Sequence, residues 1–497
     1  MTVSPAVSGA AVLLAGVVAV TAFAPFGWYP AAILAFAVLF NQWLCDTPGQ
    51  AFRHGALFGA GFFGAGISWV YVSVHTYGHV HPLAAGLVTV ILVAFLSVYP
   101  ALLGYLLKRS RRVYSMTAMV LVFPAGWVLS EWLRGWLFSG FPWLSIGTSQ
   151  IDGPLGGFAP LVGVPGIGLA VGLSAALLVA AVRGRLKIIS LAMLAVLWLG
   201  GYVFNQIEWT RPRGEPLKVA LIQGNITQDN KWAPGNLMNT LTRYGELTFA
   251  QPDIDLFVWP ETAIPAFHHQ VADNYLPHLE TELRNHGSTL LTGIPVLEKD
   301  SWEYYNAVVS LGGERAFYYK QHLVPYGEYL PLRWLIGSGL DALAVPNADF
   351  SEGGDDQPLL MAAGVPVSSS ICFEVVFGEQ IIRDLPEAGL LVNVSNDAWF
   401  GDSLAPQQHL EMARMRAKET GRPMLRATNT GITAVVDGQG TVVARSAQFE
   451  EAVVTATVMP RQGATPYVRL GNWPVVVVSL MLVLLPLART SHRGASR

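Results

Sequence analysis

The chain has 497 residues, of which 52% are hydrophobic and only 13% are charged, about half the charged share of an average soluble protein. This composition excludes a disordered chain and argues against a wholly water-soluble globule. The net charge of −3 gives no indication of nucleic-acid binding, and two cysteines, Cys45 and Cys372, exclude a disulfide scaffold or a Cys-rich zinc site.

Charge is unevenly distributed along the chain. Residues 205–471 hold 31 of the 34 acidic residues but only 19 of the 31 basic ones, which gives this segment a net charge of −12. The flanking sequences are apolar with a basic excess. We therefore predict an N-terminal membrane domain over residues 1–204, a polar domain over 205–471, and a C-terminal helix and tail over 472–497.

Eight apolar runs, each close to the roughly 20 residues that a helix needs to cross a bilayer, recur in the flanking parts. For any single run, a buried core helix is the alternative. Eight runs, seven of them before residue 205, instead predict a polytopic α-helical membrane bundle of about eight transmembrane helices. The runs cover residues 7–24, 28–44, 55–74, 83–107, 114–137, 161–182, 188–204 and 473–488.

The positions of Lys and Arg predict the orientation of this bundle, because cytoplasmic loops carry an excess of both. Basic residues occupy alternate loops, at Arg53, 108–112 and 183–187, and the tail after residue 488. Both termini are therefore expected in the cytoplasm, and the acidic domain on the opposite face of the membrane.

Glu131 and Arg134 lie three residues apart within the fifth apolar run. An ionisable residue inside a membrane span is a candidate for function. The alternative, which we favour, is a mutually satisfied pair that stabilises the bundle.

The polar domain alternates short β-rich runs with helical patterns, which indicates an α/β layered fold. Strands are expected at 217–223, 255–259, 288–295, 306–311, 316–319, 365–371, 390–394, 433–436, 441–444 and 453–458. Helices are expected at 236–249, 273–285, 378–385 and 407–420.

Three chemically distinctive residues each close a predicted strand: Glu261, Lys320 and Cys372. Sites in open α/β sheets form outside the carboxyl ends of strands. A thiol nucleophile, a carboxylate base and an ammonium that stabilises an oxyanion would suffice for covalent catalysis. We expect a following helix and Lys320 to lower the thiol pKa. A buried inert thiol is the alternative for Cys372, which has no disulfide partner in the polar domain.

The polar domain resembles the nitrilase superfamily, whose fold is an αββα sandwich with a Glu-Lys-Cys triad. From about residue 20 to about residue 485, the chain resembles the apolipoprotein N-acyltransferase family. The motifs that carry the resemblance lie at 69–78, 131–135, 259–262, 320–328, 371–374 and 393–401.

The resemblance implies that Cys372 is the nucleophile, Glu261 the general base and Lys320 the cation facing the tetrahedral intermediate. Phe373 follows the nucleophile where the family often has Tyr, so any role of that hydroxyl is absent or filled elsewhere.

Supporting roles are implied for Glu328, Glu374 and Trp232, and each has a simpler alternative. Glu328 could be a solvated loop carboxylate, although its place eight residues after Lys320 favours orientation of that lysine. Glu374 could form a surface salt bridge with Arg383. Trp232 could be a core or interface aromatic.

The segment 329–344 is rich in Leu and Trp and has almost no charge. Such a segment suits a bilayer interface, so we favour a lid that contacts lipid over ordinary packing under the domain.

The resemblance further implies transfer of an acyl chain from a membrane phospholipid, through a thioester, to the α-amine of a diacylated apolipoprotein. It implies a bacterial inner membrane location with a periplasmic catalytic domain, and no cofactor or nucleic-acid partner. Two alternatives stay open: a membrane-bound amidase that uses water as acceptor, and a non-catalytic transporter or receptor.

Overall fold

The computed structural model describes residues 5–109, 116–184, 187–329 and 350–488. Contacts divide the chain into two compact units. The apolar unit comprises residues 1–207, 403–411 and 469–497, and the α/β unit comprises residues 208–402 and 412–468. The predicted lid at 329–344 lies, except for Tyr329, outside the described residues.

The apolar unit is helical, and each of the eight predicted apolar runs overlaps one long helix. These helices are α1 (Pro5–Val20), α2 (Pro30–Cys45), α3 (Pro48–Gly66), α5 (Pro82–Arg109), α6 (Met116–Arg134), α7 (Ala159–Val182), α8 (Lys187–Phe204) and α17 (Trp473–Ala488). Short turns are α4 (Trp69–Val72), η1 (Ser73–Tyr77), η2 (Leu137–Ser139), η3 (Ile146–Gln150) and η4 (Pro154–Phe158). The third run, 55–74, continues past the end of α3 into α4 and η1.

Length and composition single out a smaller number of full membrane spans. Among the described residues, Pro82–Arg109, Pro154–Val182 and Lys187–Phe204 are long and apolar enough to cross a bilayer. A fourth span arises if α3 and the helix Trp69–Tyr77, bent by 51° from it, are counted together. The prediction of about eight spans is thus not confirmed by this criterion. Helices α1, α2 and α17 are shorter, and α6 is not among the helices that meet it.

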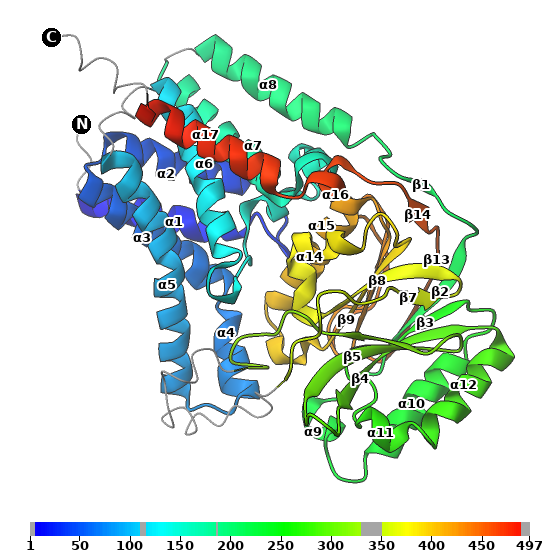
Figure 1. Cartoon of the computed structure of the whole chain (residues 1–497). Helices are drawn as coiled ribbons and strands as arrows, with labels where there is room; N and C mark the ends of the chain where they lie inside the picture. The colour runs from blue at the N-terminus through cyan, green and yellow to red at the C-terminus, as the bar shows by residue number, and fades with distance from the viewer. Residues whose placement is uncertain (1–4, 110–115, 185–186, 330–349, 489–497) are drawn as a thin grey trace. The chain divides into compact units, whose positions relative to one another are not determined.

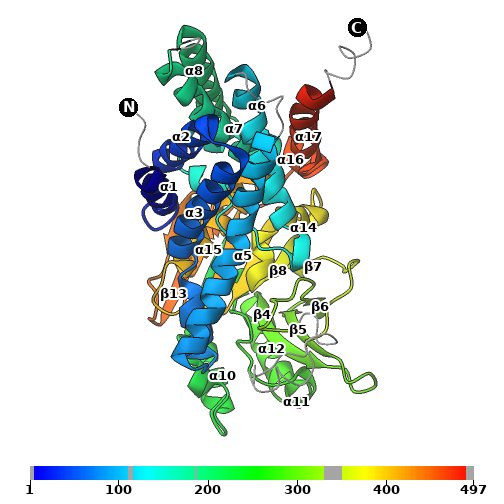
Figure 2. The ribbon, with the colours of Figure 1, turned by 90° about the vertical axis from the view of Figure 1, so that its left-hand side faces the viewer.

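Helices α3 and α5 pack at backbone contact, and Figure 2 shows them side by side. A Cβ atom at Gly55 would lie 2.3 Å from the carbonyl oxygen of Pro100, and one at Gly59 would lie 2.8 Å from the Cα of Ser97. Small residues that permit such close approach are typical of helix contacts in membranes.

The Glu131–Arg134 pair fixes the chain that follows α6. The two side chains are 3.8 Å apart, and Glu131 accepts a hydrogen bond from the N–H of Ile146 at 2.8 Å. Arg134 donates to the carbonyl oxygens of Phe141 at 2.6 Å and Trp143 at 2.5 Å. Because both charges are buried and bonded, these contacts favour the interpretation that the pair stabilises the fold.

The α/β unit contains two six-stranded sheets, each with three parallel strands at its centre. The first has the order β13 (Ala452–Val458), β2 (Leu217–Gln223), β3 (Leu256–Val258), β4 (Thr289–Leu297), β5 (Tyr304–Leu311) and β6 (Ala316–Tyr319). The second has the order β12 (Val442–Arg445), β11 (Ala434–Val436), β10 (Met424–Thr428), β9 (Leu390–Ser395), β8 (Val365–Ile371) and β7 (Leu360–Ala362). A small pair joins β1 (Arg211–Pro212) to β14 (Arg461–Gln462).

The two sheets face each other across one apolar core and are flanked by helices. Val258 and Leu291 of the first sheet share a buried cluster with Ile371 and Val394 of the second. Figure 1 shows helices beside the outer face of each sheet. The predicted αββα sandwich is confirmed. The helices of this unit include α9 (Gln228–Lys231), α10 (Leu237–Phe249), α11 (His268–Val271), α12 (Tyr275–His286), α14 (Gly378–Ile381) and α15 (Ala405–Thr420), whose first turns belong to the apolar unit.

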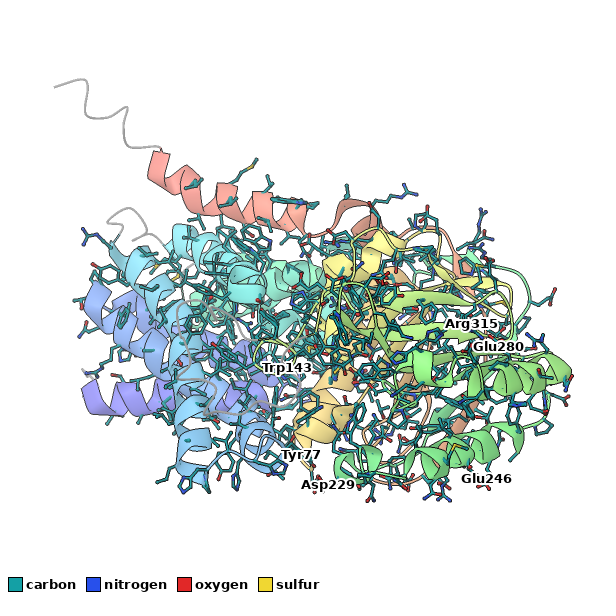
Figure 3. The ribbon with its side chains drawn as sticks, turned by 60° about the horizontal axis from the view of Figure 1, so that its bottom comes forward. Tyr77, Trp143, Asp229, Glu246, Glu280 and Arg315 are labelled. Atoms are coloured by element: carbon teal, nitrogen blue, oxygen red, sulfur yellow. The ribbon has the colours of Figure 1, made fainter. Side chains whose placement is uncertain are left out.

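The spacing of apolar residues explains how the outer helices dock. Leu241 and Tyr244 of α10, three residues apart, point to the same cluster as Leu279 and Leu283 of α12, as expected for amphipathic helices on a sheet. On the surface, Glu280 of α12 accepts a hydrogen bond at 2.9 Å from Arg315, just before β6 (Figure 3).

Candidate active site

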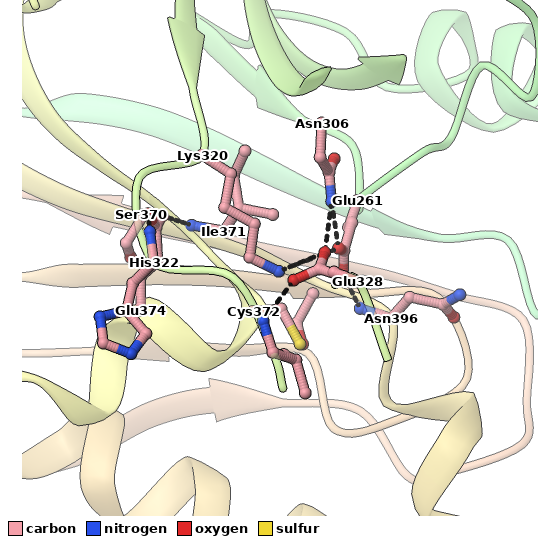
Figure 4. A network of polar contacts seen from close by, with 12 residues as sticks. Glu261, Asn306, Lys320, His322, Glu328, Ser370, Ile371, Cys372, Glu374 and Asn396 are labelled. Carbon is pink, nitrogen blue, oxygen red and sulfur yellow. Dashed lines mark hydrogen bonds and ion pairs between the residues drawn. The ribbon is translucent and has the colours of Figure 1, made fainter. Parts of the chain in front are cut away.

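The structure brings Glu261, Lys320 and Cys372 together from the ends of three strands (Figure 4). Glu261 follows β3 and Lys320 follows β6, both in the first sheet, whereas Cys372 follows β8 in the second. The Lys320 Nζ lies 3.8 Å from Glu261 Oε1, and its ammonium interacts electrostatically with the thiol of Cys372. The site therefore lies where the carboxyl ends of strands from both sheets meet.

The Glu261 carboxylate is held at both of its oxygens. Oε1 accepts a hydrogen bond from Asn306 Nδ2 at 2.7 Å, and Oε2 accepts one from the N–H of Asn396 at 2.8 Å. Its main-chain carbonyl accepts a third, at 3.1 Å, from the buried ammonium of Lys231. Burial raises the pKa of the Glu261 carboxyl, and Lys320 offsets this only in part. A raised pKa makes this carboxylate a stronger proton acceptor.

Lys320 is buried and clamped by carboxylates. Its Nζ donates to Glu328 Oε1 at 2.7 Å, while Glu328 Oε2 accepts from the N–H of Val324 at 2.8 Å. Burial alone would lower the pKa of Lys320, but Glu328 and Glu261 outweigh it and raise this pKa. Lys320 is therefore a fixed cation, and Glu328 is not a solvated loop carboxylate.

Cys372 occupies a sharp turn directly after β8. Its φ of +54° lies in the left-handed region, which is costly for a residue with a side chain, and the 3₁₀ turn η6 (Cys372–Val376) begins at this residue. Its main-chain carbonyl accepts a hydrogen bond from Asn393 Nδ2 at 3.3 Å. A strained turn of this kind holds the thiol at the open end of the strand.

The expectation of a lowered thiol pKa is wrong. Burial and the neighbouring Glu261 raise the pKa of Cys372 to about 12, and the opposing effect of Lys320 is smaller. A pKa this high favours the neutral thiol, so a nucleophilic role of Cys372 would require a base that takes its proton. Glu261, with its own pKa raised, is placed for this role.

Glu374 forms hydrogen bonds to the main chain next to Lys320 and to the main chain next to Cys372. Its Oε1 accepts hydrogen bonds from the N–H groups of Gln321 at 2.7 Å and His322 at 3.0 Å, just after Lys320. Its Oε2 accepts from the N–H of Ile371 at 2.6 Å, just before Cys372. The alternative of a surface salt bridge with Arg383 is wrong, because Arg383 pairs with Asp355 at 3.2 Å and Glu374 is fully buried.

The other two predicted positions lie at the margin of the site. The Phe373 ring packs edge-on against Phe377, with ring centroids 5.1 Å apart. Trp232 follows α9 and has 49% of its surface exposed, so it is not a core aromatic. Its neighbour Lys231 donates a hydrogen bond to the main-chain carbonyl of Glu261.

Sequence reasoning missed Asn306, Asn396 and Lys231, all of which hold Glu261. Asn396 lies within the motif at 393–401, but Asn306 reads only as the first residue of a strand. In the parts of the chain that the structure describes, no group of three or more His, Cys, Asp or Glu side chains could hold a metal ion.

A thiol, a carboxylate and an ammonium at strand ends of an αββα sandwich define the α/β unit as a carbon–nitrogen hydrolase-like domain. Residues 218–467 match the family described as carbon-nitrogen hydrolase. Residues 15–177 match the family described as apolipoprotein N-acyltransferase N-terminal domain.

Full-length relatives extend both matches. The chain is 46% identical to the apolipoprotein N-acyltransferase of Methylococcus capsulatus over 489 residues, 97% of each chain. It is 46% identical to that of Nitrosomonas europaea over 484 residues, 96% of this chain and 97% of the relative. It is 41% identical to that of Pseudomonas syringae over 478 residues, which cover 95% of this chain and 94% of the relative. The chain belongs to the apolipoprotein N-acyltransferase family.

Proposed function

We propose that this protein is a membrane-bound acyltransferase that N-acylates lipoproteins. It takes an acyl chain from a phospholipid, holds it as a thioester on Cys372, and passes it to the α-amine of the diacylglyceryl-cysteine of an apolipoprotein. The observation that carries the proposal is the convergence of Cys372, Glu261 and Lys320 at one site, in a chain whose full-length relatives are named apolipoprotein N-acyltransferase.

The first step forms the thioester. The Cys372 Sγ attacks the carbonyl carbon of the phospholipid ester while Glu261 takes the thiol proton. Lys320 stabilises the negative charge that develops on the carbonyl oxygen. When the carbon–oxygen bond breaks, Glu261 returns the proton to the departing glycerol oxygen, and a lysophospholipid leaves.

The second step transfers the acyl group. The lipoprotein amine attacks the thioester carbon and Glu261 accepts a proton from the attacking nitrogen. The Cys372 sulfur then leaves and takes that proton from Glu261. An amide forms and the free thiol returns, so ping-pong kinetics follow. The scheme uses no metal or organic cofactor.

We further propose supporting roles around these three residues. Glu328 orients Lys320 through the contact at 2.7 Å. Glu374 positions the chain on both sides of the site. Trp232, half exposed at the end of α9, contacts the lipid substrates.

The proposal places the protein in a bacterial inner membrane, with about eight transmembrane helices, both termini in the cytoplasm and the catalytic domain over residues 205–471 in the periplasm. Exposed apolar side chains along α8 support contact with lipid: Ile188 is 83% and Val196 71% exposed. Because both substrates are lipid-anchored, confinement to one bilayer surface raises their effective concentration.

Intact mass spectrometry of the purified protein tests the proposal. After incubation with phospholipid vesicles, we expect a hydroxylamine-sensitive acyl increment on Cys372, which moves to the amine of an added diacylated lipopeptide. Cys372→Ser should gain no such thioester increment, whereas Cys45→Ser should behave like wild type.

Two other outcomes would contradict the proposal. An increment that is lost equally fast without lipopeptide would indicate a hydrolase with water as acceptor. No increment, under conditions in which a known relative is acylated, would exclude the thioester and favour a binding protein.

A further inference from the structure

Ser395 lies directly beside the Cys372 thiol, outside the three predicted catalytic residues. Strands β8 and β9 are parallel, with Ile371 opposite Val394. One residue further along each segment, Cys372 directly after β8 therefore lies beside Ser395, the last residue of β9. The side chains of Cys372 and Ser395 are hydrogen-bonded. Ser395 is fully buried, so water does not compete for this contact.

The same Ser395 hydroxyl has a second partner, Asp397. It donates to Asp397 Oδ1 at 2.7 Å, and Arg426 Nη2 donates to both oxygens of Asp397, at 3.1 Å and 2.8 Å. The side chains of Asp397 and Arg426 are both 0% exposed. Arg426 therefore compensates the Asp397 charge whether or not Ser395 donates to it.

A serine hydroxyl has one hydrogen and two acceptor lone pairs, so Ser395 cannot donate to Asp397 and Cys372 at once. While the thiol is neutral, the hydroxyl donates to Asp397 and its oxygen can accept the S–H hydrogen. A thiolate sulfur has no hydrogen to give and is a charged acceptor, for which a donor is worth more than for a neutral one.

We propose that Ser395 is a further catalytic residue, whose hydroxyl turns from Asp397 to the Cys372 sulfur when the thiol loses its proton. The S–H proton passes to Glu261, the O–H bond of Ser395 stays intact, and Asp397 keeps its bonds to Arg426. This inference rests on the proposed function, in which Cys372 is the nucleophile. The hydroxyl acts twice, because the sulfur is the attacking atom in the first step and the leaving group in the second.

Alkylation of the full-length protein by iodoacetamide tests this switch, the turn of the Ser395 hydroxyl from Asp397 to the Cys372 sulfur. It needs no acyl transfer, since only the thiolate reacts. The rate at Cys372 is read by mass spectrometry of its peptide, with Cys45 of the same chain as internal reference. We expect Ser395→Ala to slow alkylation of Cys372 roughly tenfold or more, because the thiolate loses a hydrogen bond and a hydrogen bond to a charged group is a strong one. Ser395→Thr, which keeps the hydroxyl, should react nearly as fast as wild type.

Ser310→Ala is the matched control. Ser310 is also a fully buried strand serine, and its hydroxyl donates to the carbonyl oxygen of Met361 at 2.8 Å. It should lose stability without slowing alkylation of Cys372. Equal alkylation rates in wild type and Ser395→Ala, or equal slowing by the Ala and Thr variants, would overturn the switch. Neither result would touch the proposed function, which fails separately if wild type forms no acyl-enzyme.

Discussion

Glu374 shows at the scale of one residue how a carboxylate can serve a site without taking part in its chemistry. A carboxylate accepts hydrogen bonds at two oxygens and has nothing to donate. The neighbouring chain offers N–H groups to both oxygens, from Gln321 and His322 on one side and Ile371 on the other. An amide in its place would set its own donor against one of these N–H donors, so this position needs two acceptor oxygens.

Lys231 gives a prediction about pH. Burial lowers its pKa to about 8, and the opposing effect of Glu261 is smaller. In the unfolded chain, a lysine has a pKa of about 10.4. Between these two values the unfolded state binds more protons than the folded state. The contribution of Lys231 to stability therefore rises as pH increases through this window, by about 3 kcal/mol in all.

The measurement compares thermal unfolding of wild type and Lys231→Met in detergent across this pH range. The midpoint of wild type should gain on that of the variant from about pH 8 to about pH 10.4, because only wild type carries this buried ammonium. A constant difference between the two proteins would show that Lys231 keeps its proton throughout, and would contradict the prediction.

At the scale of elements, β4 supports the turn that carries Glu261. A Cβ atom on Gly293 of β4 would lie 2.3 Å from the main-chain nitrogen of Thr262 and 2.7 Å from the Cα of Glu261. No side chain fits there without moving this turn. The glycine therefore allows the turn that carries Glu261, the proposed general base, to lie directly against β4.

We expect Gly293→Ala to destabilise the protein by about 1–3 kcal/mol and to slow formation of the acyl-enzyme, because the displaced turn moves Glu261 away from Asn306 and Cys372. Gly245→Ala, in helix α10 with open space around it, is the control and should raise stability by about 0.5–1 kcal/mol. Thermal unfolding and the rate of acylation of Cys372 check both effects. Unchanged acylation in a folded Gly293→Ala protein would show that the turn tolerates the shift.

At the scale of the whole molecule, the proposed topology can be tested with cysteine labelling. Cys45 is exposed at the end of α2, and Ser301 is exposed at the tip between β4 and β5. In a Cys372→Ser background, a membrane-impermeant maleimide should label Cys45 in spheroplasts only after permeabilisation. With Cys45 also replaced, Ser301→Cys should be labelled in intact spheroplasts. The reverse pattern would invert the topology.

Much of the whole molecule could be predicted from local patterns. Strand β2 reads as an apolar run because both faces of a central parallel strand are buried, and the strand ends pointed to Glu261, Lys320 and Cys372. Strand β10 was missed because Arg426 interrupts its apolar pattern, and the partners of that arginine, Asp397 and Asn393, lie on another segment of the chain.

The missed parts of the site depend on tertiary contacts. The hydrogen bond from Asn306 to Glu261 depends on the pairing of β5 with β4, and the local sequence pattern does not predict this pairing. The predicted direction of the Cys372 pKa shift was wrong because burial has the largest effect on this pKa. The extent of burial cannot be read from the neighbours of a residue in sequence.

The division of the proposed triad between two sheets has a consequence for newly made chains. Glu261 and Lys320 belong to the first sheet and Cys372 to the second, so a chain whose sheets have not yet packed has a thiol but no base beside it. With the proposed chemistry, an unfinished or damaged copy in the membrane cannot cleave the phospholipids that surround it. On this proposal, the protein becomes able to cleave a phospholipid only once its two sheets have packed together.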